Sequence, residues 1–287
     1  MHKNHMPVVS CKASRIIKHT FDGILIYIYR GFFMNKTLLA FNRKMGFLHL
    51  IQGLAILILS LTVDVFKDFK PTVFGRFFEV YESGGYGPVT QAMFDLPFGI
   101  LVSLFLLLSA LFHFLISGPF KDYYLTNIDK GINTLRWYEY ALSSSIMIVL
   151  LAAMFGLLTI EAIILIFTIN ALMNLFGLLM EKMNPLDRTK TDWTAHWFGW
   201  VAGLAPWVMI VIYMLNNGDL SQLPWFVIPG LIFYFLTFNL FAFNQYFQYK
   251  KIGPWKDYIY GERMYVWLSL FGKSVLAWFI FLGILLA

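Results

Sequence analysis

The chain has 287 residues, of which 59% are hydrophobic and 13% are charged, and its formal net charge is +6 at pH 7. This composition is too apolar for a soluble domain and is typical of a protein that crosses a membrane several times. The basic surplus has no accompanying signal for nucleic-acid binding. The single cysteine, Cys11, excludes a disulfide within the chain, and the sequence indicates no metal site.

Seven apolar segments are long enough to cross the roughly 30 Å hydrocarbon core of a bilayer as helices. We predict spans at 45–65, 97–117, 134–156, 160–180, 196–215, 225–247 and 264–286. A buried core helix could explain one or two such segments, but not seven in succession. The predicted fold class is therefore an all-α membrane protein, a seven-helix bundle of one domain.

The two sides of this bundle differ in basic charge. Of the 22 Lys and Arg residues, Lys67, Lys70 and Arg76 lie in one loop, Lys273 lies within the last span, and the other eighteen lie on the opposite side. Basic residues are enriched in cytoplasmic loops, so the asymmetry predicts a cytoplasmic N-terminus and a C-terminus outside.

Residues 1–36 are predicted to be a basic extension ahead of the bundle, which we assign to 37–287. The apolar stretch Phe21–Tyr29 is too short to span a membrane, and no signal-peptide cleavage site follows it. We expect an amphipathic helix on the inner leaflet. The alternative is that translation starts at Met34.

The longest outer connection runs from about Phe66 to Leu96 and is rich in β-branched and aromatic residues. The sequence Ser83-Gly84-Gly85 within it is a turn signal. The pattern predicts a short β-hairpin, packed over the outer mouth of the bundle or against a partner chain. A loop without regular structure is the alternative.

Two histidines lie in the first two predicted spans. His49 shares a helix face with Gln52, and His113 is spaced by four residues from Ser109 and Ser117. A lone histidine in an apolar helix is more often a packing residue than a ligand. Two histidines in adjacent helices, each beside polar neighbours, indicate a shared polar cavity.

The third predicted span carries Glu139 inside an apolar run, one turn after Arg136 and one turn before a run of serines at 143–145. A buried carboxylate is costly unless it is paired. Lys273 is the one cation that the predicted spans place in the membrane core, so we expect Glu139 to be its counterion. Pairing of Glu139 with Arg136 at the membrane edge is the alternative.

Lys273 lies near the middle of the final span, with Ser269 and Ala277 on the same helix face. A charge at this depth costs about 2.5–3.5 kcal/mol on insertion scales and usually marks a functional site. Snorkelling requires a position closer to a helix end.

A buried lysine can condense with an aldehyde, and a nearby carboxylate keeps the resulting iminium protonated. Seven helices, a lysine in the middle of the last and a carboxylate in the third form the pattern of retinal proteins.

Distinctive stretches occur along all seven predicted helices. They are FNRKMGFLHLIQ, LSALFHFLIS, LRWYEYALSSSIMIVL, NALMNLFG, WFGWVAGLAPW, NQYFQYK and GERMYVWLSLFGKSVLAW. With these stretches the chain resembles the heliorhodopsins, a microbial family of retinal proteins, from about Lys36 to the C-terminus. The resemblance implies a rhodopsin-like bundle with its N-terminus inside, in agreement with the charge asymmetry.

The resemblance also implies a cofactor and its site. Lys273 is expected to carry all-trans retinal as a protonated Schiff base, with Glu139 as the counterion. The other expected site residues are Ser269 and Ser144 near the Schiff base, His49, His113 and Ser109 in a polar cavity beside it, and Asn170, Met173, Trp207 and Phe238 along the chromophore.

The function that the resemblance implies is sensory or regulatory signalling through a slow photocycle, without ion pumping and without enzyme activity. The protein is expected in a cell or viral-host membrane, in contact with lipid, as a homodimer to which the first outer loop contributes. A cytoplasmic signalling partner is expected, and no nucleic acid.

The residues themselves argue against pumping. Leu150 stands eleven residues after Glu139, where outward proton pumps carry a second carboxylate, and Ser269 stands where a second counterion would be. Glu139 is expected to be the only deeply placed acid, so no relay of several carboxylates is predicted. A light-gated passive proton channel with the same chromophore is the alternative function. A zinc enzyme using His49, His113 and His196 is a third hypothesis, but its spacing follows no known motif. A transporter that binds an anion at Lys273 is a fourth.

Overall fold

The computed structural model describes the backbone of residues 9–82, 84–216, 218 and 223–286, and the side chains of this set from residue 36 onward. Residues 1–41 and 42–287 form two separate compact units. Helix α1 (Val9–Thr62) begins in the first unit, so the predicted extension is helical from Val9. The amphipathic character expected of that extension falls on side chains outside the described set.

Seven helices in the described part of the chain are long and apolar enough to cross a membrane. They are residues 36–62 of α1, α3 (Phe98–Ser117), α5 (Thr134–Met154), α6 (Ile160–Met183), α7 (Thr194–Asn216), α8 (Val227–Lys250) and α9 (Tyr258–Leu286). The predicted seven-helix fold is confirmed. The last span begins earlier than expected, at Tyr258.

Short helical segments connect some of these spans. They are α2 (Asp64–Lys67), α4 (Lys121–Ile128) and the 3-10 helix η2 (Gly253–Lys256). The connection from α4 to α5 ends at Asn133, whose side chain accepts a hydrogen bond from the backbone N–H of Arg136 and so caps α5. This cap fixes where the first turn of α5 begins.

The predicted hairpin is confirmed. Strands β1 (Thr72–Val80) and β2 (Tyr86–Asp95) pair antiparallel, and their connection contains Gly84 and Gly85 at positive φ, a conformation open to glycine at no steric cost. The backbone N–H of Phe74 donates to the carbonyl of Leu158, which ties the base of β1 to the connection between α5 and α6.

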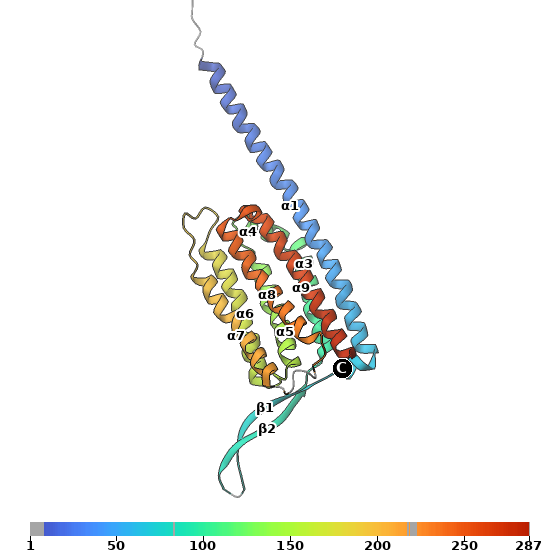
Figure 1. The fold of residues 1–287 in the computed structure, drawn as a ribbon. Helices are drawn as coiled ribbons and strands as arrows, with labels where there is room; N and C mark the ends of the chain where they lie inside the picture. The colour runs from blue at the N-terminus through green and yellow to red at the C-terminus, as the bar shows by residue number, and fades with distance from the viewer. Residues whose placement is uncertain (1–8, 83, 217, 219–222, 287) are drawn as a thin grey trace, which may run out of the picture. The chain divides into compact units, whose positions relative to one another are not determined.

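Beyond this base, the hairpin extends away from the helices, and most of its side chains are exposed (Figure 1). Of the two expected positions, packing over the outer mouth of the bundle is therefore not found. Packing of the hairpin against a partner chain stays a prediction.

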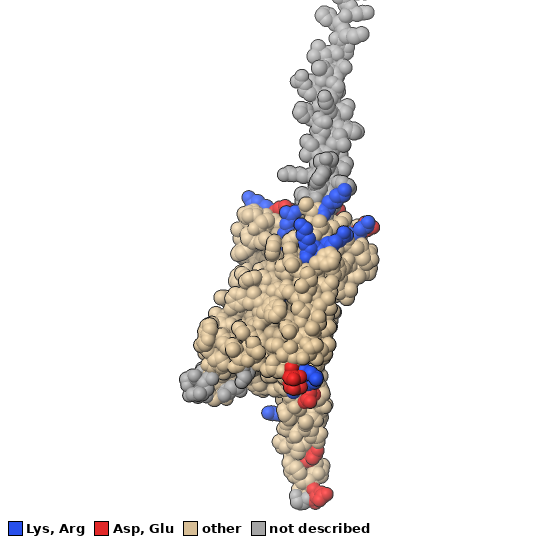
Figure 2. Space-filling view, turned by 90° about the vertical axis from the view of Figure 1, so that its right-hand side faces the viewer, with Lys and Arg blue, Asp and Glu red and all other residues tan. Residues whose placement is uncertain are grey.

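Helix α5 lies at the centre of the second unit, where it packs against α3 and α6, while α9 packs against α8. Its second half is apolar all round, as expected of a helix enclosed by others, and Ile148 and Leu150 are fully buried. Outward-facing positions such as Ile51, Val201 and Leu236 are apolar and exposed. In Figure 2 the flank between the two ends of the helices carries no charged side chain. This apolar girdle suits a lipid environment.

Candidate functional site

Three helices bring one polar side chain each to a common point. The Lys273 Nζ of α9 lies 2.5 Å from Glu139 Oε1 of α5 and 2.6 Å from Ser109 Oγ of α3. The Ser109 hydroxyl donates to the same carboxylate oxygen at 2.7 Å. Because the lysine is only 4% exposed, the ammonium and carboxylate compensate each other's charge away from water.

The helix periodicity explains why these side chains meet. Ser109 lies on the buried stripe of α3 that includes Phe105 and His113, and Lys273 lies on the stripe of α9 that includes Ser269 and Ala277. Residues three or four apart share a helix face. Since both stripes face α5, the two side chains converge on Glu139.

Arg136 is not the partner of Glu139, so the alternative pairing considered for that carboxylate is not found. Arg136 instead forms ion pairs with Glu181 of α6 and Glu262 of α9. All three side chains are buried, which corrects two expectations from the sequence. Lys273 is not the one cation in the core, and Glu139 is not its one deeply placed acid.

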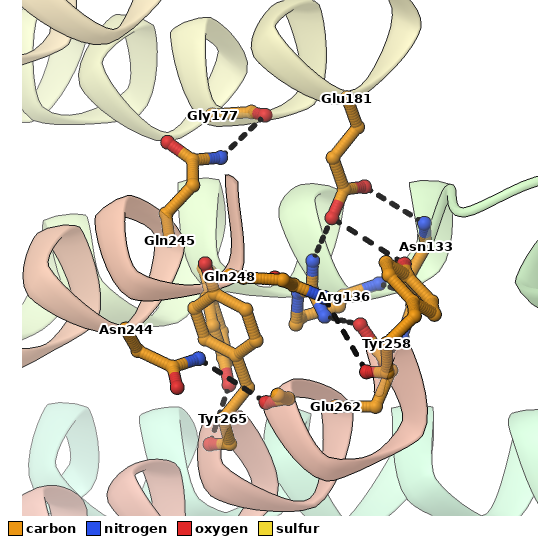
Figure 3. Close-up of polar contacts among 12 residues, drawn as sticks. Asn133, Arg136, Gly177, Glu181, Asn244, Gln245, Gln248, Tyr258, Glu262 and Tyr265 are labelled. Atoms are coloured by element: carbon orange, nitrogen blue, oxygen red, sulfur yellow. Dashed lines mark hydrogen bonds and ion pairs between the residues drawn. The ribbon is translucent and has the colours of Figure 1, made fainter. Parts of the chain in front are cut away.

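Glu181 and Glu262 are buried because the helices that carry them extend further than the predicted spans. Glu181 lies just after the predicted span 160–180, but α6 continues to Met183, and the carboxylate is buried. Similarly, α9 begins at Tyr258, which places Glu262 inside the helix and not in the preceding loop. Figure 3 shows the resulting contacts among Asn133, Arg136, Glu181, Tyr258 and Glu262.

The two histidines predicted to share a polar cavity lie side by side. The rings of His49 and His113 are stacked with centroids 5.5 Å apart, and His113 Nδ1 lies 2.9 Å from Asn42 Oδ1. Within the described residues, neither ring nitrogen of His49 has a hydrogen-bond partner. The adjoining cavity is lined by residues that include Asn42, Ser109, His113, Asn133, Arg136, Glu139 and Ser269.

A largely apolar cavity of about 490 Å³ begins at Lys273. Ser144, Ser269, Met173 and Phe238 are among its lining residues, as expected. A second cavity of about 600 Å³ shares Met173 and Phe238 with the first and continues to Trp207. A mostly apolar lining with a few polar groups is typical of small-molecule sites. A long apolar aldehyde with its reactive end at Lys273 fits this arrangement.

Asn170 was expected to lie along the chromophore, but it lines neither cavity. Its side-chain amide donates to Ser144 Oγ at 2.8 Å and to Ser145 Oγ at 3.0 Å. It therefore holds the serine run of α5 against α6 and acts on the cavity wall through Ser144.

Sequence reasoning missed several residues of the cavity at Lys273. They are Tyr140, Met147, Asn174, Tyr234, Thr237, Phe241 and Gly272. The sixth span is dense in aromatic residues, and spacing alone does not distinguish the inward-facing Phe241 from Phe243, which is 43% exposed. Tyr140 lies four residues before Ser144 and so shares a helix face with an expected site residue. This spacing could have predicted it.

His196 does not join the other two histidines. Its Nδ1 lies 3.2 Å from Gln245 Oε1, and its Nε2 accepts a hydrogen bond from Trp200. The described residues contain no group of three His, Cys, Asp or Glu side chains placed to hold a metal ion. The zinc-enzyme hypothesis therefore has no geometric basis in this part of the chain.

A seven-helix membrane bundle with a buried lysine and carboxylate at the end of an apolar cavity is the arrangement of retinal-binding photoreceptors. The family model described as Heliorhodopsin matches residues 38–285 of the chain. The chain belongs to the heliorhodopsin family. Comparison with curated proteins gave no match.

Membership of this family makes the protein an integral multi-pass membrane protein that binds retinal and senses light. The family is one of photoreceptors and not a classical enzyme family.

Proposed function

We propose that Lys273 binds all-trans retinal as a protonated Schiff base and that Glu139 is its counterion. The observation that carries this proposal is the buried contact of 2.5 Å between Lys273 Nζ and Glu139 Oε1 at the end of the apolar cavity. Bound retinal supplies the absorption of visible light and the photoisomerisation.

The surrounding residues support the pair in distinct ways. The Glu139 carboxylate keeps a positive charge on the lysine nitrogen favourable in a buried site, and Ser109 hydrogen-bonds to both members. Met173, Trp207 and Phe238 form apolar walls that would hold the polyene in place and exclude water.

The histidine cavity is the proposed destination of a proton that leaves the Schiff base. His49 and His113 can each accept a proton, and Ser109 and Glu139 line the same cavity as His113. A charge accepted there stays close to Glu139, so the pair can be restored from the same side. The arrangement thus favours a proton that leaves and returns over one that crosses the membrane.

The proposed role is sensory or regulatory signalling through a slow photocycle, with a cytoplasmic partner protein. Leu150, which stands at the position of a second carboxylate in outward pumps, is fully buried among apolar residues.

We further propose that the N-terminus is cytoplasmic and that the protein is a homodimer. In Figure 2 basic side chains gather at the upper end of the helices, which supports that orientation.

The test of the chromophore proposal is the variant Lys273→Ala. Protein expressed with retinal should absorb visible light, and the variant should lose this absorption because no amine remains to bind retinal. The exposed Lys182 offers a matched control, since Lys182→Ala removes a lysine outside the cavity and should keep the colour. A variant that keeps the wild-type spectrum would contradict the assignment of Lys273.

The test of signalling against conduction is a photocurrent recording on membranes that contain the coloured protein. A signalling protein should give no light-dependent current. A sustained current that reverses with the proton gradient would establish the alternative, a light-gated proton channel.

A further inference from the structure

A second buried charge centre lies in α5, α6 and α9, one turn before Glu139. We call it the Arg136 cluster; it consists of Asn133, Arg136, Glu181, Tyr258 and Glu262. The Arg136 guanidinium is paired with both carboxylates and lies over the ring of Tyr265, 3.9 Å from its centroid. Figure 3 shows that these side chains point toward one another from separate helices.

The charges of the Arg136 cluster do not balance if both carboxylates are ionised. One guanidinium would face two carboxylates, and the exposed fractions of the three side chains are 4% for Arg136 and 1% for each glutamate. The phenols that face the carboxylates, which are Tyr124, Tyr249, Tyr258 and Tyr265, are neutral at physiological pH. In Tyr124, between the spans, burial and the nearby Glu262 raise the pKa of the hydroxyl. An uncompensated negative charge in such surroundings is strongly unfavourable.

The hydrogen-bond partners distinguish the two carboxyl groups. Glu262 Oε1 accepts from Arg136, and Glu262 Oε2 accepts from the Asn133 side-chain N–H at 2.8 Å. Neither the guanidinium nor that N–H can accept a proton. The partners found for Glu262 therefore suit an ionised carboxylate.

Glu181 has a partner of a different kind. Its Oε2 accepts from the backbone N–H of Asn133. Its Oε1, which accepts from Arg136, also lies 3.5 Å from the Tyr258 hydroxyl, and that hydroxyl can turn from donor to acceptor. Glu181 also lies in the last turn of α6, where the aligned backbone carbonyls disfavour a negative charge. Both features favour the protonated form of Glu181.

We propose that the Arg136 cluster is a proton-binding site, in which Glu181 holds one proton while Arg136 and Glu262 form the ion pair. The bound proton makes the cluster neutral. Asn133 and Arg136 also line the histidine cavity, so this proton lies next to the one that Glu139 and the histidines exchange. The site is a second protonatable centre, distinct from the lysine–carboxylate pair.

The test is infrared spectroscopy of the retinal-loaded protein in the dark, in H2O and in D2O. Wild-type protein should show a carbonyl band of a protonated carboxylic acid that shifts on deuteration. Glu181→Gln should remove the band, because glutamine keeps the shape of the protonated acid but has no acidic proton. Glu161→Gln, which changes an exposed carboxylate of the same helix, should keep it. Absence of the band in wild type, or its persistence in Glu181→Gln, overturns the proposal.

A second variant keeps the test decisive if Glu181→Gln fails to fold. Glu262→Gln leaves one carboxylate for one guanidinium, so Glu181 should release its proton and the band should disappear. A band that survives Glu262→Gln contradicts the proposed charge balance. A band that is kept in Glu181→Gln would place the proton on a group other than Glu181 and overturn its assignment.

A further readout is the melting temperature as a function of pH. Rising pH removes the bound proton and leaves a buried negative charge, so wild-type melting temperature should fall on the alkaline side. In Glu181→Gln and Glu262→Gln the melting temperature should fall less with rising pH than it does in wild type or in Glu161→Gln. Equal pH profiles in all four proteins would contradict the proposal.

Discussion

At the scale of single residues, Glu139 contacts Ser109 and Lys273, and its replacement affects these two groups differently. Ser109 remains a neutral hydrogen-bond partner of the Lys273 nitrogen, but the positive charge on that nitrogen loses its carboxylate. In Glu139→Gln the Schiff base should therefore lose its proton at a lower pH than in wild type. While it stays protonated, it should absorb further to the red. Absorbance titration of the purified variant measures both effects.

Ser109→Ala is the matched control for Glu139→Gln, because it removes a hydrogen bond at the same point without changing the charge. Its spectral and titration changes should be smaller than those of Glu139→Gln. If the two variants titrate alike, the carboxylate is not the main counterion.

The same scale shows what the sequence could predict of the site. Glu139 and Lys273 are charges in the middle of apolar runs, and such positions require partners inside the protein. Glu181 and Glu262 lie near helix ends, where a charge is normally hydrated, so the sequence alone gave no reason to bury them. Their contact with Arg136 joins residues far apart in the chain, and no local pattern predicts it.

At the scale of elements, the contact between α5 and α6 depends on a small residue. A Cβ added at Gly177 of α6 would lie 2.3 Å from the Trp137 ring of α5, which itself packs edge-on against Tyr140 and Tyr265. Because the added Cβ would overlap a buried aromatic ring, Gly177→Ala should destabilise the folded protein by about 1–3 kcal/mol through overpacking. Thermal unfolding of the coloured protein measures this change.

Gly283 of α9 provides the comparison, because a Cβ there would meet Met154 at 3.5 Å, an ordinary contact. Gly283→Ala should unfold close to the wild-type temperature. The prediction fails if the two alanine variants are equally stable.

Helix periodicity and turn residues were sufficient to predict the elements themselves. The seven spans and the hairpin follow from apolar length, from β-branched and aromatic residues and from the Gly84-Gly85 turn. The direction of the hairpin could not be predicted, because neither strand has one apolar face and one polar face that would indicate which side packs against the bundle. Phe74 links the hairpin to the backbone at Leu158 and Thr159, a contact that leaves no sequence signal.

At the scale of the whole molecule, the distribution of basic residues predicts how the bundle sits in the membrane. The loops after α3, α6 and α8 and the start of α1 should face the cytoplasm, and the hairpin should face outward. A cysteine placed at exposed Lys250 should react with a membrane-impermeant reagent only in inverted vesicles. A cysteine at Arg76 of β1 should react in intact cells, and the reverse pattern would overturn the proposed orientation.

Three tryptophans border the second cavity, and this arrangement has an optical consequence. Trp137, Trp200 and Trp207 all line the space that continues from the lysine, and they belong to α5 and α7. Indole emission lies in the near ultraviolet, and a conjugated polyene held within contact distance is an efficient acceptor of that energy. Retinal binding should therefore quench the emission of these indoles, so the fluorescence of the protein would report loading of the cavity independently of the visible colour. A Trp207→Phe variant should show a smaller quenching amplitude.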